Sequence, residues 1–134
     1  MYMLDTDTCS YIIKERPPAV LERFKQVAMD EICISIVTYS ELRYGVERSS
    51  SKKINHEVIS LFIKYLNVLD WDKDAADTYA RIRSTLESNG TPIGNMDMMI
   101  GAHAKSLGAT LITNNTKHFK YIDGLSIDNW VHST

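Results

Sequence analysis

The chain has 134 residues, of which 44% are hydrophobic and 24% are charged, a balance typical of one globular domain with a buried core. Its formal net charge of -2 argues against a broad basic surface for nucleic acid, so such a substrate would have to meet local positive charge. No apolar run is long enough to cross a bilayer, and the start of the chain, MYMLDTDT, lacks the features of a signal peptide. We therefore expect a cytoplasmic protein in which residues 1–134 form a single domain.

The first third of the chain alternates short apolar runs with amphipathic segments. In chain order, the pattern predicts a strand at Tyr2–Leu4, a helix that stops before Pro17, a helix over Pro18–Val27 and a strand at Ile32–Val37. Thr38 is then expected to cap the next helix, with Glu41 completing a T-x-x-E capping box. Cys9 and Cys33 form no C-x-x-C pair, so we predict reduced, packed thiols rather than a zinc site.

The same alternation continues to the end of the chain. The first expected element is a helix that carries Ile54, Val58, Leu61, Phe62 and Leu66 on one face. The elements predicted after it are a strand at Val68–Trp71, a helix over Asp72–Glu87, a loop over Ser88–Met96, a helix from Asp97 closed by Gly108, a strand at Ala109–Thr113, a short helix ending near Phe119 and an edge strand at Leu125–Ile127. Helices that alternate with short apolar strands predict a three-layer α/β/α fold around a central, mostly parallel sheet of four to five strands.

Carboxylates and amides fall where the predicted strands end. Asp5 ends the first strand, Glu41 lies about one turn into the helix after the second, and Asn114 and Asn115 leave the fourth. Active sites of such folds lie beyond the carboxyl ends of the strands, and the glycine-rich loop before Asp97 would let that residue reach the same edge. Clustered carboxylates attract a cation, and oxygen ligands without His or Cys suit Mg²⁺ or Mn²⁺. A phosphate ester is then the natural substrate, although these residues do not choose between RNA and other phosphate esters.

Three segments resemble the PIN-domain ribonucleases, and specifically the VapC toxins of toxin–antitoxin pairs. They are MLDTDTCSYIIK, ISIVTYSELRYGVE and GTPIGNMDMMIGAHAKSLGATLITNNTKHF, and together they span almost the whole chain. The resemblance implies that Asp5, Glu41 and Asp97 are the catalytic acids of a Mg²⁺-dependent endoribonuclease, for which Mn²⁺ is a possible substitute. It implies that Asp5 and Asp97 are the direct metal ligands and that Glu41 binds through water or helps to activate the nucleophile.

Four polar residues would support these acids. Thr6 and Asn114 match the family's small polar positions that orient the carboxylates. Asp7 stands where the family usually has Asn, and the sequence leaves open whether Asp7 binds metal or caps the first helix. Asn115 stands where many members have a fourth acid, so it supplies an oxygen but no charge, and a second metal ion is in doubt.

The resemblance also implies partners. The expected substrate is RNA, specifically initiator tRNA cut in the anticodon loop, and the expected inhibitor is a VapB-type antitoxin that places an Arg or Lys among the acids. A homodimer and a toxin–antitoxin hetero-oligomer are expected, and no membrane. Arg43 and Lys117 are candidates for RNA contact, although charges of this kind more often belong to solvated faces.

Two alternatives remain open at the level of sequence. Asp5-Thr6-Asp7-Thr8 also fits the D-x-D-x-T signature of HAD-type phosphomonoesterases, in which the first Asp is the nucleophile and the second is the general acid. The chain is short for that fold, and Glu41 would have no role in it. The other alternative is a catalytically inactive PIN-like binding module, which the absence of the fourth acid motivates.

Overall fold

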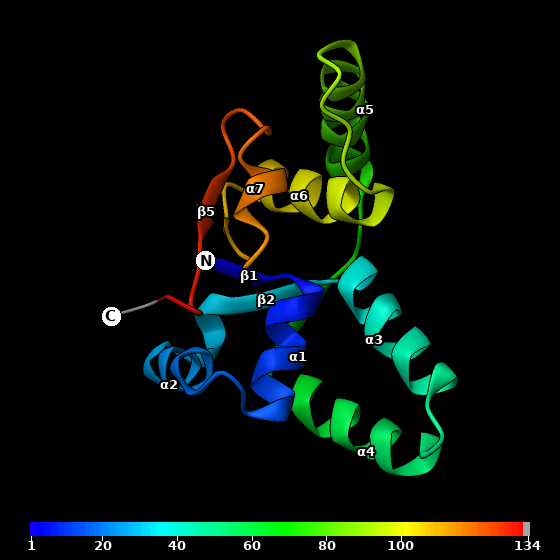
Figure 1. The fold of residues 1–134 in the computed structure, drawn as a ribbon, viewed down its shortest axis with the longest axis vertical. Coiled ribbons are helices and arrows are strands. Elements are labelled where there is room, and N and C mark those ends of the chain that lie inside the picture. The colour runs from blue at the N-terminus through cyan, green and yellow to red at the C-terminus, as the bar shows by residue number, and fades with distance from the viewer. Residues whose placement is uncertain (133–134) are drawn as a thin grey trace.

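A computed structural model, which describes residues 1–132, contains a five-stranded sheet between two layers of helices (Figure 1). Its strands are β1 (Tyr2–Leu4), β2 (Ile32–Ser35), β3 (Asn67–Leu69), β4 (Thr110–Ile112) and β5 (Ser126–Asp128). All neighbouring strands are parallel, in the order β3-β2-β1-β4-β5. The predicted three-layer fold is confirmed; residues 133–134 of the predicted domain lie outside the described part.

The helices divide between the two faces of the sheet. They are α1 (Thr6–Lys14), α2 (Pro18–Gln26), α3 (Ile36–Arg48), α4 (Lys52–Ile63), α5 (Lys73–Ser88), α6 (Asn95–Leu107) and α7 (Thr116–Phe119), with a short 3₁₀ turn, η1 (Met29–Glu31), before β2. Figure 1 shows α5, α6 and α7 on one side of the sheet and α1, α2 and α4 on the other, with α3 reaching beyond one end. This arrangement follows from parallel strands, which need a crossover connection between each pair.

Two hydrophobic clusters form the core, one on each face of the sheet. Consecutive strand residues point to opposite faces, so Met3 and Leu111 pack with residues of α5, α6 and α7. Leu4 and Ile112 pack with residues of α1, α2, α3 and α4. Because both faces are covered, the strands read as continuous apolar runs, which is why their positions could be predicted.

The second strand ends earlier than the sequence predicted. Helix α3 begins at Ile36, and its N-cap is Ser35, whose hydroxyl accepts a hydrogen bond from Val37 N at 3.1 Å. The expected strand up to Val37 and the expected cap at Thr38 are therefore wrong, and Thr38 lies buried inside the helix. The β-branched residues at 36 and 37 favour a strand locally, and the serine cap together with burial outweighs that preference.

Helix α4 buries only part of the apolar face that the sequence predicts. Ile59 of the helix and Leu66 beyond its end are buried, and Phe62 packs partly buried against the same core, whereas Ile54 and Leu61 are 64% and 67% exposed and Val58 is also exposed. Ile54, Val58 and Leu61 therefore form an exposed part of that face. An exposed stripe of this kind is typical of a surface that a partner covers.

Two further expectations can be compared with the structure. Cys9 and Cys33 are buried free thiols, as predicted, and burial raises the pKa of both. Among residues 1–132, no helix has the length and apolarity needed to cross a membrane.

Candidate metal-binding active site

The order in which the chain adds strands to the sheet reverses between β1 and β4. The chain runs outward from β1 through β2 to β3, and then returns to the other side of β1 as β4. A crevice forms at the carboxyl ends of strands where the order reverses in this way. Asp5 follows β1 at this point, and Thr113 follows the neighbouring strand β4. The backbone N–H of Asp5 donates a hydrogen bond of 3.1 Å to the carbonyl oxygen of Ile112, the last residue of β4.

Asp5 is a buried carboxylate with a fixed orientation. It caps α1, since its Oδ1 accepts a hydrogen bond from Thr8 N at 2.8 Å, and it is only 5% exposed. Burial raises its pKa from 3.8 to about 6, the nearby charge of Asp7 adds to this, and hydrogen bonds from Thr113 and Thr8 oppose it. An anionic group held in so dry a place is stabilised by a cation.

Asp97 lies in the first turn of α6, whose N-cap is Gly94. The expected start of this helix at Asp97 is therefore two residues late, since α6 begins at Asn95. Burial raises the pKa of Asp97, and the negative charges of Glu41 and Asp7 raise it further. His118 and a hydrogen bond from Asn115 act in the opposite direction. The effect of the Glu41 and Asp7 charges on Asp97 indicates that these side chains lie near it.

Glu41 is tied to the first helix. The hydroxyl of Thr6 donates a short hydrogen bond to Oε1 of Glu41, which links α1 to α3 next to Asp5. The structure thus links Glu41 to the segment that follows Asp5 and places Glu41 within electrostatic range of Asp97, and a single metal site formed by all three acids stays a prediction. Asp5 directly follows β1, Glu41 lies in the second turn of α3, and Asp97 lies in the first turn of α6.

The predicted supporting residues have different hydrogen-bond partners. Asn115 hydrogen-bonds Asp97 and lies 2.8 Å from Nδ1 of His118, whereas the amide oxygen of Asn114 accepts a bond from Asn129 at 3.0 Å. The role of Asn114 in orienting the acids stays a prediction. Asp7 is exposed, and Asp5 takes the capping role that the sequence had left open to Asp7.

The two candidate RNA-binding residues differ in the contacts of their charged groups. Arg43 pairs with Glu47 at 3.9 Å and hydrogen-bonds His56, so its guanidinium is directed along α3 towards α4. Lys117 is exposed on α7, within three residues of Asn115.

Two threonines at the site were missed by sequence reasoning. Thr113 is fully buried, hydrogen-bonds Asp5, and accepts a bond from Asn115 N at 2.9 Å. Thr8 donates its hydroxyl to Ile112 O at 3.1 Å. Both hold the carboxylate of Asp5 against β4. Their signal was available, since each lies within three residues of a predicted site residue at the end of a strand.

The donor set fits a magnesium-type ion. Within residues 1–132, no three His, Cys, Asp or Glu side chains lie close enough together to ligate one ion directly. Mg²⁺ is usually held by one or two carboxylates and keeps several waters, so two direct acids and one water-linked acid suit it. Every candidate donor here is an oxygen, which counts against zinc.

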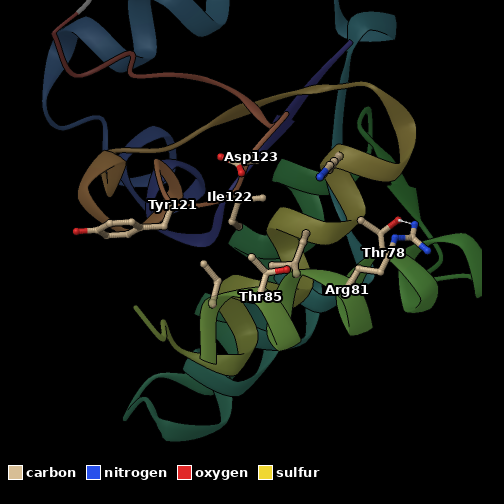
Figure 2. Close-up of a pocket in the computed structure, with 9 residues that line it drawn as sticks. Thr78, Arg81, Thr85, Tyr121, Ile122 and Asp123 are labelled. Carbon is tan, nitrogen blue, oxygen red and sulfur yellow. Dashed lines mark hydrogen bonds between the residues drawn. The ribbon is translucent and has the colours of Figure 1, made fainter. Parts of the chain in front are cut away.

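Two cavities of about 360 Å³ differ in their relation to the acids. One is bounded by Thr6 and Glu41 and by an apolar wall of Ile13, Leu42 and Val58 between α1, α3 and α4. The other lies against the last turn of α6 and contains none of the acids (Figure 2). Its lining residues include Thr78, Arg81, Thr85, Lys105, Tyr121 and Asp123. Only the first cavity adjoins the candidate site.

Comparison with known proteins decides the family. The model of the PIN domain matches residues 2–125. The chain belongs to the PIN-domain family. It is 42% identical over 129 residues to the tRNA(fMet)-specific endonuclease VapC of Shigella flexneri, covering 96% of this chain and 97% of that protein. It is 37% identical over 131 residues to ribonuclease VapC2 of Rickettsia felis, covering 97% and 98%. The structure of DNA-bound VapBC from Salmonella typhimurium superimposes with a TM-score of 0.91 at 43% identity, covering 96% and 97% of the two chains.

These findings decide between the interpretations that the sequence left open. The predicted PIN-domain fold, the resemblance to VapC toxins and the assignment as an endoribonuclease are confirmed. The phosphomonoesterase alternative and the inactive binding module are not supported, since the PIN-domain relatives are named as ribonucleases and endonucleases. Nucleases of the PIN-domain family generally depend on a divalent metal ion.

Proposed function

We propose that this chain is the toxin of a toxin–antitoxin pair and that it hydrolyses initiator tRNA in the anticodon loop, using Mg²⁺. The proposal is supported by the place of Asp5 where the strand order reverses, by the hydrogen bond from Thr6 to Glu41, and by the effect of the Glu41 charge on the pKa of Asp97. The name of the Shigella flexneri relative supports the choice of tRNA(fMet) as substrate.

In this proposal, Asp5 and Asp97 are the direct ligands of Mg²⁺, and Mn²⁺ can replace it. The bound ion supplies charge neutralisation at a phosphate oxygen and a lower pKa for a bound water. Thr8 and Thr113 hold Asp5 in place, and Asn115 orients Asp97. Glu41, held by Thr6, would position the water that attacks the phosphorus atom, as one bridging P–O bond breaks and the leaving ribose oxygen takes up a proton.

The cavity beside the acids supports an antitoxin as the second partner. Its wall is mostly apolar, and it leads directly to Glu41. An antitoxin segment with apolar side chains and one Arg or Lys would fill the cavity and neutralise the acids. Solved structures of VapBC complexes from Salmonella typhimurium and Rickettsia felis support this partner, and the exposed stripe of α4 offers further area. We propose a homodimer that assembles with the antitoxin in the cytoplasm.

Positive charge for RNA is local in this proposal. Lys117 is exposed on α7, two residues after Asn115, and is the stronger of the two candidates. Arg43 would have to leave Glu47 before it could reach a phosphate.

The experiment is cleavage of defined tRNAs by the purified protein. Initiator tRNA, elongator methionine tRNA and a phosphomonoester are each incubated with Mg²⁺, with Mn²⁺ and with a chelator. Cleavage of initiator tRNA alone, lost with the chelator and in Asp97→Ala, is the expected result. Uncut initiator tRNA in both metals would refute the proposal, and matching cleavage of the elongator tRNA would refute the specificity.

A further inference from the structure

A buried polar contact joins two elements that carry acids of the site. Nδ1 of His103 on α6 lies 2.8 Å from Oγ of Ser35 at the end of β2, although the two residues are 68 positions apart in the chain. His103 is 2% exposed and Ser35 is 0% exposed. Leaving either partner of a buried polar pair without a hydrogen bond costs free energy, so the two side chains are held at hydrogen-bonding distance.

The other contacts of Ser35 are compatible with a donor role for its hydroxyl in this pair. The serine oxygen accepts from Val37 N as the cap of α3, which leaves its proton available for another partner. When that proton is donated to Nδ1 of His103, the ring is neutral and protonated at Nε2. Burial lowers the pKa of His103, against the opposing charge of Asp72 on α5, and so favours this neutral form.

Each partner of the hydrogen bond is six residues away, along its own helix, from an acid of the site. Ser35 comes six residues before Glu41, and His103 comes six residues after Asp97. Each distance is about 9 Å along a helix at about 1.5 Å per residue. Helix α6 packs extensively on α5 and less on α3, and the His103–Ser35 bond connects the helix of Asp97 to the N-cap of the helix of Glu41.

We propose that His103 and Ser35 are positioning residues, whose buried hydrogen bond sets the spacing between Asp97 and Glu41. Neither residue touches the metal or the RNA; they act through the two helices. The inference rests on the proposed function of the acids, and it adds a requirement that the acids alone do not state. Small displacements of catalytic groups are costly, and partners behind metal ligands typically contribute 10- to 100-fold to metal affinity or activity.

The test compares three variants with the wild-type protein. His103→Leu removes the acceptor but keeps an apolar side chain, whereas His103→Asn keeps an oxygen acceptor close to the position of Nδ1. Ile82→Val is the matched control, since Ile82 is a buried residue of α5 whose role is packing alone. Mn²⁺ affinity is measured by calorimetry without RNA, and kcat and KM are measured separately on initiator tRNA.

His103→Leu is expected to lose about 10- to 100-fold in Mn²⁺ affinity and kcat, with KM for RNA unchanged. His103→Asn should recover most of this, and Ile82→Val should lose neither. The double variant His103→Leu with Ser35→Ala should be no worse in kcat than the poorer single variant, because one contact is lost only once.

The inference would be overturned by a His103→Leu protein that is merely easier to unfold and keeps wild-type Mn²⁺ affinity and kcat. If His103→Leu does not fold, Ser35→Ala takes its place, and wild-type Mn²⁺ affinity in that variant has the same meaning. A wild-type protein that neither binds Mn²⁺ nor cuts RNA would refute the proposed function itself, and the inference with it.

Discussion

Replacing Asp5 with asparagine should stabilise the metal-free protein at pH 7 while it abolishes RNA cleavage. The carboxylate is buried, and burial raises its pKa to about 6, so holding it ionised at neutral pH opposes folding. Asparagine has the same shape, can accept the bond from Thr8 N, and is as good a helix N-cap as aspartate. The substitution therefore removes a charge and keeps the local contacts.

The size of the effect follows from the pKa. The change from 3.8 to about 6 corresponds to about 3 kcal/mol, an upper value for the gain in stability at pH 7. Between these two values the folded protein binds more protons than the unfolded chain, so wild-type stability from this group falls as pH rises. Below pH 3.8 both states are protonated, and the difference between Asp5→Asn and the wild type should vanish.

Urea unfolding with a chelator, at half-unit steps from pH 3.5 to pH 7, measures this difference. The gap between Asp5→Asn and the wild type should open between about pH 4 and pH 6 and then remain constant. Asp7→Asn is the matched control; because Asp7 is exposed, its stability should stay within about 0.5 kcal/mol of wild type. An Asp5→Asn protein that is no more stable than wild type at pH 7, or a gap that is the same at pH 3.5, would refute the reasoning.

Three further results are expected. Asp97→Asn should abolish cleavage of end-labelled tRNA while circular dichroism stays unchanged, since its side chain is only partly buried; residual wild-type cleavage would remove it from the site. Mn²⁺ affinity should rise with pH through about 6, because Asp5 must lose its proton to bind the ion, and calorimetry in two buffers should detect the released proton; a flat profile would contradict this. Gly101→Val should cost about 1–3 kcal/mol in thermal unfolding, since a Cβ there would lie 2.8 Å from Ile122 Cδ1 and 3.3 Å from Phe119, whereas an unchanged midpoint would show that these side chains move aside freely.

The features that could be predicted from the sequence are those with a local signal. Buried parallel strands read as apolar runs, so β1 was predicted residue for residue and β4 within one or two residues. Asp5 stands at the end of β1, where the fold places active sites, and family motifs marked Glu41 and Asp97.

The features that could not be predicted depend on contacts between distant segments. Helix α3 begins after Ser35, whose hydroxyl forms a hydrogen bond with His103, a residue far along the chain. The sequence around Thr38 gives no sign of this contact. Helix α4 carries more apolar residues than the core takes up, so the sequence does not say which of them are buried. The hydrogen bond between Thr113 and Asp5 arises only when β1 and β4 pair, so the sequence did not single out Thr113.

The position of a bound ion tests the central claim most directly. Anomalous diffraction from crystals of the antitoxin-free protein soaked in Mn²⁺ should give a peak about 2.1 Å from carboxylate oxygens of both Asp5 and Asp97, with Glu41 reaching the ion through a water. An Mn²⁺ peak that lies away from Asp5 and Asp97, or none at a concentration that supports RNA cleavage, would contradict the account.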